Sequence, residues 1–187
     1  VTTDVVVLDM PSALFLDLQA CQNNPTTFTD LSSITNGNIT NWTWDFGDGS
    51  PTVNDQNPTH TYTTDGNFNV TLTVTSDFGC SNSVVIPTIV YPAPVADFTA
   101  PVGCPDDTIQ YTDLSTISSG TIVSWQWDFD DGSQDNVQHP LHQFQTLNDS
   151  FYVELVVTSN FGCTDTAVNL IQTHPFPTFQ YGPEWAA

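Results

Sequence analysis

Lysine and arginine are both absent from this sequence, although it carries 21 aspartate and glutamate residues, so its formal net charge is -21. A uniformly negative surface repels phosphate backbones and anionic lipid headgroups, which excludes nucleic acids and anionic membranes as expected partners. Conventional salt bridges are largely excluded too, because only four histidines and the amino terminus can carry positive charge. Stability must therefore come from burial, backbone hydrogen bonds and covalent links.

Long apolar runs are also missing. No stretch approaches the roughly 20 consecutive apolar residues that a membrane-spanning helix needs, and the first residues do not have the pattern of a signal peptide. We therefore expect no membrane insertion, and a targeting signal that was removed or lies upstream.

What the sequence does contain is an internal repeat with an offset of 83 residues. Thr-Asp-Leu-Ser at 29–32 recurs at 112–115, and Phe-Gly-Cys at 78–80 recurs at 161–163. The same offset relates Cys21 to Cys104, Trp42 to Trp125, Trp44 to Trp127, and Cys80 to Cys163. We assign 1–10 to the last strand of a preceding repeat, 11–92 to repeat one, 93–175 to repeat two, and 176–187 to the start of a following repeat.

Each repeat has the hydrophobic pattern of an all-β domain. Apolar and polar residues alternate without a break over 67–75 and again over 151–157, which is typical of a strand with one buried face in an antiparallel sheet. Short strands separated by Gly, Asn, Asp and Pro turns predict a β-sandwich. The proline-rich joins at 91–94 and 174–177 predict stiff connections, and hence a linear rod of tandem sandwiches.

The four cysteines fall two per repeat, with 59 residues between the members of each pair. An even count in an acidic, apparently secreted chain favours disulfides within each domain. We predict Cys21–Cys80 and Cys104–Cys163. The alternative is a metal site, which neither a Cys-x-x-Cys spacing nor a nearby histidine supports.

A seven-residue motif recurs in the two repeats, Trp-Asp-Phe-Gly-Asp-Gly-Ser at 44–50 and Trp-Asp-Phe-Asp-Asp-Gly-Ser at 127–133. Its aromatic residues share one strand face by the period of two and predict core positions. Its Asp and Gly residues predict a tight turn held by carboxylates that accept backbone N–H bonds. The motif and core residues are Trp44, Asp45, Phe46, Asp48 and Gly49, and Trp127, Asp128, Phe129, Asp131 and Gly132.

This motif, followed by Asn-Pro-Thr-His-Thr-Tyr at 57–62 and an alternating strand, resembles the signature of the PKD (polycystic kidney disease) domain. Repeat two departs from the family pattern at Asp130, which replaces the first Gly, and at Phe144, which replaces Tyr. Asp tolerates a positive φ better than most residues, so the turn is expected to survive with some strain. The resemblance implies an immunoglobulin-like fold and an extracellular location, at the cell surface or secreted.

The cysteine pair ending in Phe-Gly-Cys is similar to PKD repeats of giant surface adhesins of Bacteroidota. That resemblance implies a non-catalytic structural or adhesive module of a long cell-surface or filament-forming protein. PKD domains also occur as accessory arms of secreted hydrolases, and this is the alternative. The expected partners are neighbouring repeats of the same chain, including self-assembly into a filament, and a glycan or surface ligand for which Trp42 and Trp125 are candidates.

Two further sites follow from the residues. Carboxylates cluster around the turn with no cationic side chain to compensate them, and hard cations such as Ca²⁺ bind several oxygens at once. The candidate calcium ligands, and the only cofactor we consider, are Asp45, Asp48, Asp128, Asp130 and Asp131. Asp-Thr-Ile at 107–109 and Asp-Thr-Ala at 165–167 resemble an O-glycosylation motif of Bacteroidota, which makes Thr108 and Thr166 candidate acceptors.

Paired carboxylates also occur in glycosidases. A tight turn that is duplicated in every repeat offers no cleft, and neither a Ser/His/Asp order nor a Gly-x-Ser-x-Gly elbow is present. We therefore predict that the chain is not an enzyme.

Overall fold

A computed structural model describes residues 9–18, 20–101, 107–145 and 150–172. The chain separates into two units, Val1–Ala93 and Pro94–Ala187, and every regular element in the described residues is a β-strand. The segments assigned above to a preceding and a following repeat fall almost entirely outside the described residues, and so does Cys104.

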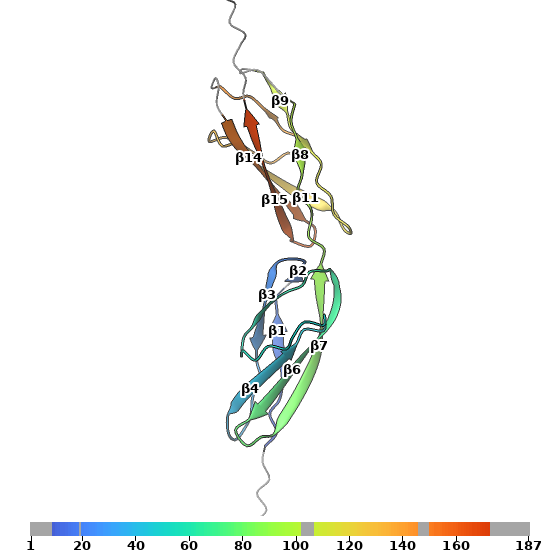
Figure 1. Ribbon diagram of the computed structural model, residues 1–187, viewed down its shortest axis with the longest axis vertical. Coiled ribbons are helices and arrows are strands. Elements are labelled where there is room, and N and C mark those ends of the chain that lie inside the picture. Colours follow the sequence, from blue (N-terminus) through green and yellow to red (C-terminus); the bar gives the residue numbers. More distant parts are fainter. Residues whose placement is uncertain (1–8, 19, 102–106, 146–149, 173–187) are drawn as a thin grey trace, which may run out of the picture. The chain divides into compact units, whose positions relative to one another are not determined.

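Repeat one consists of two sheets (Figure 1). One has the order β1-β3-β5 and the other the order β2-β7-β6-β4. The strands are β1 (Phe15–Asp17), β2 (Ala20–Cys21), β3 (Pro25–Asp30), β4 (Ile39–Asp45), β5 (Thr59–Thr61), β6 (Gly66–Ser76) and β7 (Ser81–Tyr91).

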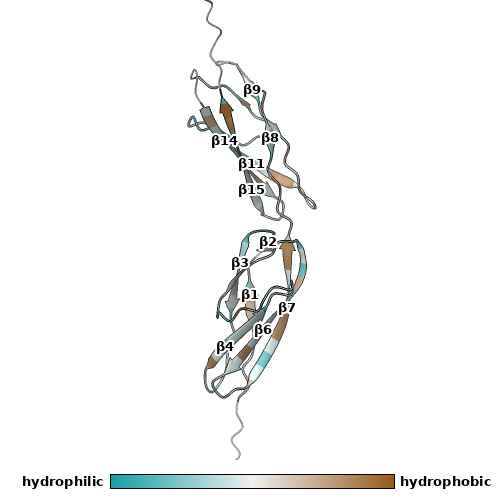
Figure 2. Ribbon diagram, in the orientation of Figure 1, coloured by the Kyte–Doolittle hydropathy of each residue, from teal (hydrophilic) through white to brown (hydrophobic). Residues whose placement is uncertain are grey.

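The alternation in β6 decides which face of its sheet is buried. Val70, Leu72 and Val74 are fully buried, while the threonines between them face outward. This strand pairs antiparallel with β7 on one side and with β4 on the other, so the predicted half-buried strand is confirmed. Figure 2 shows that β7 begins with hydrophilic residues and ends with hydrophobic ones.

Aromatic residues of the two sheets meet in the core of repeat one. Phe15 on β1 lies 5.1 Å from Trp44 on β4 between ring centroids, and Phe28 on β3 lies 5.7 Å from the same indole. All three side chains are buried. Because the rings come from opposite sheets, repeat one is a β-sandwich, as its strand pattern predicts.

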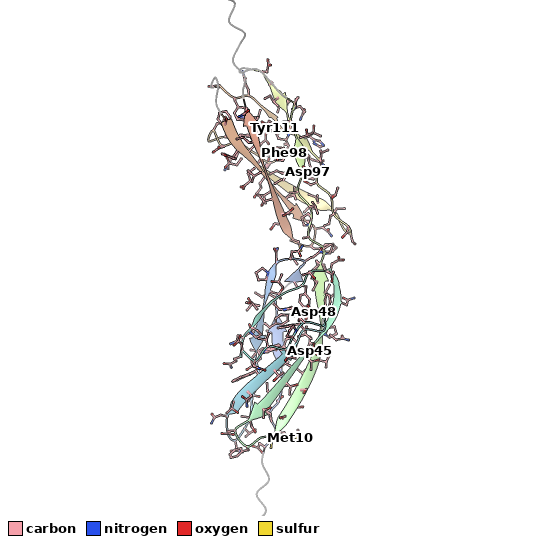
Figure 3. All side chains as sticks on the ribbon, viewed as in Figure 1. Met10, Asp45, Asp48, Asp97, Phe98 and Tyr111 are labelled. Atoms are coloured by element: carbon pink, nitrogen blue, oxygen red, sulfur yellow. The ribbon has the colours of Figure 1, made fainter. Side chains whose placement is uncertain are left out.

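Repeat two has the same plan, with a main sheet of order β12-β11-β14-β15 and the small pairs β10-β8 and β13-β9. Phe98 and Tyr111, which are labelled in Figure 3, pack against Trp127 with centroid distances of 5.1 and 5.7 Å. The strands are β8 (Phe98–Thr99), β9 (Ile109–Gln110), β10 (Thr112–Asp113), β11 (Ile122–Asp128), β12 (Gln134–Asp135), β13 (Leu141–His142), β14 (Ser150–Ser159) and β15 (Thr164–Gln172).

The first segment of repeat one contacts the start of its last strand at Pro11 and the end of that strand at β2. Near the start of β7, Asn82 Nδ2 donates a hydrogen bond of 2.9 Å to the carbonyl of Pro11. At the other end, β2 pairs parallel with β7, with Cys21 opposite Tyr91 (Figure 1). The chain therefore enters repeat one at one end of β7 and leaves it at the other.

Candidate functional site

The aromatic residues of the motif are core residues, as predicted. Trp44 and Trp127 are no more than 1% exposed, and so are Phe46 and Phe129. The buried indole N–H groups have acceptors, because Trp44 donates to the carbonyl of Asp55 at 2.9 Å and Trp127 to that of Val137 at 3.0 Å.

The second tryptophan of each repeat is half-buried and is anchored by an aspartate. Trp42 Nε1 donates to Asp30 Oδ2 at 2.7 Å, and Trp125 Nε1 donates to Asp113 Oδ2 at 2.8 Å. Sequence reasoning missed both aspartates. The signal was present, because each belongs to the repeated Thr-Asp-Leu-Ser segment, but nothing in the sequence indicates that a tryptophan 12 residues later is its partner.

Asp113 is only 8% exposed, and its carboxylate accepts two further hydrogen bonds, from Ser115 N at 2.9 Å and Gln138 Nε2 at 3.0 Å. Burial raises the pKa of this carboxyl, but the hydrogen bonds from Ser115, Gln138 and Trp125 outweigh it, so the pKa lies below its ordinary value. Asp113 is therefore ionised and multiply bonded at neutral pH.

In repeat one, the Asp residues of the motif stabilise the turn after β4. Asp45 Oδ1 accepts a bond of 2.9 Å from Gly47 N, and Asp48 Oδ1 accepts bonds from Ser50 N at 3.0 Å and Ser50 Oγ at 2.6 Å. Gly49 adopts a φ of 82° in this turn. These are local carboxylate-to-backbone bonds of the kind that stabilise Asx turns.

The turn of repeat two is built in the same way. Asp128 accepts from Asp130 N at 2.9 Å, and Asp131 accepts from Ser133 N at 3.0 Å, with Gly132 at a φ of 89°. The hydrogen bond from Asp130 N lowers the pKa of Asp128. The predicted role of these carboxylates in fixing the turn is confirmed.

A histidine contacts the second aspartate of each turn, from β5 in repeat one and from β13 in repeat two. His60 Nε2 lies 2.7 Å from Asp48 Oδ2 and stacks on Phe46 with ring centroids 4.0 Å apart; His142 Nε2 lies 2.9 Å from Asp131 Oδ2. Partial burial raises the pKa of Asp48, but hydrogen bonds from Ser50 and His60 outweigh it and lower that pKa to about 2.

The family departure at Asp130 is accommodated in the structure. Gly47 has a φ of 75°, and a Cβ at that position would lie 2.7 Å from the carbonyl oxygen of Asn69. Asp130 takes the equivalent left-handed conformation with a φ of 60°. Its Oδ2 accepts a bond of 2.9 Å from the backbone N–H of Tyr152, which partly offsets the conformational strain.

The candidate calcium ligands already accept hydrogen bonds from protein groups. Asp45, Asp48, Asp128 and Asp131 accept backbone bonds within their own turns, and Asp130 accepts one from the backbone N–H of Tyr152 on β14. Among the described residues, no group of three or more His, Cys, Asp or Glu side chains lies close enough together to hold a metal ion. Calcium binding stays a prediction. So does O-glycosylation, for which Thr108 and Thr166 both lie exposed on the surface.

The predicted Cys21–Cys80 disulfide is wrong. Cys21 lies opposite Tyr91 at the end of β7, whereas Cys80 directly precedes Ser81 at its start. An 11-residue strand at about 3.3 Å per residue separates the two by roughly 30 Å, and a disulfide requires Cα atoms within about 7 Å. Consistent with this, Cys80 is a free thiol while Cys21 is disulfide-bonded.

In repeat two, Cys163 occupies the turn position equivalent to that of Cys80 and is disulfide-bonded. The predicted partner, Cys104, lies outside the described residues. The spacing of 59 residues gave no indication that Cys21 and Cys80 fall at opposite ends of repeat one.

Comparison with known proteins identifies the family of these two domains. The PKD domain family model matches residues 9–90 and 91–173. The chain belongs to the PKD domain family. Within the described residues, no helix has the length and apolar character to span a membrane.

Among curated proteins, the chain is 36% identical over 112 residues to the pre-pro-metalloprotease PrtV of Vibrio cholerae, a match covering 55% of this chain and 11% of that protein. Among solved structures, the PKD1 domain of PrtV is 33% identical and covers 44% of this chain and 98% of its own, with a TM-score of 0.41. The PKD1 domain of Vibrio anguillarum Epp is 28% identical, with a TM-score of 0.41, and covers 44% of this chain and 95% of its own.

Proposed function

We propose that this tandem PKD segment is a non-catalytic, extracellular structural and adhesive module of a long cell-surface or filament-forming protein, similar to the repeats of Bacteroidota surface adhesins. The observation that supports the proposal is that the motif residues form hydrogen bonds within their own repeat. In both repeats the aspartates, the histidine and the tryptophans bond to their own turn and core. These bonds stabilise the fold of a single domain, and such a domain can be repeated along a chain.

Composition supports an extracellular place for the module. The absence of Lys and Arg leaves no cleavage site for a trypsin-like protease, and disulfide-bonded cysteines suit an oxidising compartment. The strong negative charge favours solubility and opposes collapse onto anionic surfaces. The partners we propose are neighbouring PKD repeats, and a glycan or another surface ligand.

A second candidate function is an accessory arm of a secreted hydrolase. The similarity to part of the metalloprotease PrtV is the observation that favours it. In that case the PKD pair would hold a catalytic domain near a polymeric substrate, and the chain would again contribute no catalytic group.

The two candidate functions are distinguished by the cellular location and the mass of the parent protein. Antibodies raised against this chain are applied to intact source cells for immunogold labelling, and to the culture supernatant for immunoblotting beside a casein zymogram. Label on the cell surface or on filaments, in a chain of several hundred kilodaltons, supports the structural module. A smaller secreted chain that comigrates with proteolytic activity refutes it in favour of the accessory arm.

A further inference from the structure

The outer face of the main sheet of repeat two carries a group of exposed apolar side chains. Tyr152 on β14 lies directly opposite Leu170 on β15, and Val168 lies opposite Glu154, two residues further along the same strands (Figure 1). Tyr152, Leu170 and Val168 are 63%, 49% and 52% exposed. Opposite and diagonal side chains on one sheet face are neighbours, so these three residues form one patch, the apolar cluster. Apolar side chains that gather on an exposed face mark interaction sites.

An open hollow lies beside the apolar cluster, over β11, β12 and β14. Its volume is about 610 Å³, and three acidic residues, Asp128, Asp135 and Glu154, are among those that line it. Glu154 is opposite Val168 on one side and opposite Asp128 on the other. Like charges directly opposite each other in a sheet are unfavourable, and the chain has no lysine or arginine to compensate them.

Repeat one provides an internal comparison for this face. At the offset of 83 residues, Asn69 and Thr71 take the places of Tyr152 and Glu154. On the neighbouring strand, Asp45 lies opposite Thr71, so the cross-strand pair of carboxylates is not formed there. Because both repeats have the same plan, the fold does not require the aromatic residue or the pair of carboxylates at these positions.

We propose that the apolar cluster and the hollow of repeat two together dock a basic segment of another protein, which places apolar side chains on the cluster and a Lys or Arg side chain in the hollow. Charge complementarity identifies this occupant, because the carboxylates of the hollow need a cation. A second copy of this chain cannot supply a Lys or Arg, since it has neither. Arginine fits best, because its planar guanidinium donates two parallel hydrogen bonds to a carboxylate.

The sheet also determines the spacing within the docked segment. In the order β11-β14-β15, neighbouring strands lie about 4.8 Å apart, so a path from β15 to β11 covers about 10 Å. An extended segment that crosses the strands covers this distance in about three residues. We therefore expect the apolar residues and the Lys or Arg of the partner to lie about three positions apart. This surface belongs to repeat two alone, so the inference holds for either proposed function.

The test uses the full chain, labelled with ¹⁵N, and the peptide acetyl-Leu-Val-Ser-Arg-Ser-Arg-amide as the probe. In an NMR titration we expect saturable shifts of the backbone amides of 152–156 and 166–170, while the equivalent segment of repeat one, 69–73, does not respond. Shifts of equal size in both repeats, or shifts that do not saturate, overturn the proposal, because they indicate attraction to the net charge alone.

Matched variants separate the docking surface from the overall charge. Tyr152→Asn introduces the residue of repeat one and should weaken binding roughly tenfold, and Glu154→Gln should weaken it about threefold. Asp65→Asn removes an exposed charge in repeat one, and screening by salt should keep its effect on binding below about 1.5-fold. If Asp65→Asn weakens binding as much as Glu154→Gln, the binding follows net charge and the proposal is refuted.

A second set of probes separates the two halves of the surface. The peptide with Ser in place of Leu and Val keeps both arginines and should bind at least about fivefold more weakly, whereas the peptide with Gln in place of both arginines should give no saturable shifts. A serine peptide that binds as tightly as the parent peptide rules out the apolar cluster. Shifts of the same amides when the chain alone is concentrated would identify a second copy as the occupant and overturn the proposal.

Discussion

Asp113 offers a sharp test of the hydrogen-bonded anchor beneath each tryptophan. Its Oδ1 accepts from Ser115 N, and its Oδ2 accepts from Trp125 Nε1 and Gln138 Nε2. Asp113→Asn keeps the size of the side chain but replaces one acceptor oxygen with an NH₂ donor. Either orientation of the amide then brings a donor against a donor, so a nearly isosteric change should be costly.

The magnitude follows from these three bonds. A buried donor left without an acceptor costs about 1–3 kcal/mol, and neutral hydrogen bonds are roughly half as strong as those to a carboxylate. With Asp113 8% exposed, we expect Asp113→Asn to destabilise repeat two by about 2 kcal/mol and Asp113→Ala by about 3 kcal/mol. Asp30→Asn should act similarly in repeat one, where Asp30 accepts from Trp42 and Gln56.

Hydrogen exchange with peptic digestion is the suitable assay, because it reads the opening free energy of each repeat separately. The other repeat of the same molecule is the internal control. If Asp113→Asn exchanges like the parent chain while Asp113→Ala is destabilised, then side-chain volume matters and the acceptor argument is refuted.

Three further predictions concern the turns and the charge. Gly47→Ala should destabilise repeat one by about 2 kcal/mol, because the added Cβ would lie 2.7 Å from Asn69 O in a left-handed conformation. Asp130→Gly should destabilise repeat two by less than about 1 kcal/mol, because relief of backbone strain offsets the lost hydrogen bond. Equal losses of stability in denaturant unfolding would contradict this. The pKa of Asp48 is lowered in the folded state from 3.8 to about 2, so the ionised carboxylate stabilises repeat one above pH 3.8. After allowance for solvent screening this stabilisation is about 1 kcal/mol, and it is lost as the pH falls through about 2. Asp48→Asn should therefore flatten the acid limb of a titration that follows unfolding against pH. Raising NaCl from about 0.05 to 0.5 M should raise Tm by several degrees by screening a net charge of -21, and a calorimetric Tm that does not change would count against charge repulsion.

The strands and the turns were predictable from the sequence because their causes are local. The period of two in residues 67–75 determines which side chains of β6 are buried, and the confirmed strand is Gly66–Ser76. Asp residues two positions before a backbone N–H fix the turn whatever the rest of the chain does. These features depend on neighbours within a few residues.

The cysteine pairing and the anchoring aspartates were not predictable because they depend on which ends and edges of the sandwich meet. Cys21 and Cys80 fall at opposite ends of β7, and no count of intervening residues reports this. Asp30 reaches Trp42 only because β3 and β4 bring them together from different sheets. Thr-Asp-Leu-Ser was recognised only as a marker of the repeat, and the role of its aspartate became visible only in the fold.

The parallel placement of β2 beside β7 has a mechanical consequence. Since the chain enters repeat one beside Asn82 and leaves it at Tyr91, a pull on its two ends slides the first segment along β7. The bonds that join β2 and Gln22 to the end of β7 are then loaded in shear, together with the bond from Asn82 to Pro11 at its start. Hydrogen bonds loaded in shear have to break together, so we expect repeat one to resist a force applied along its chain.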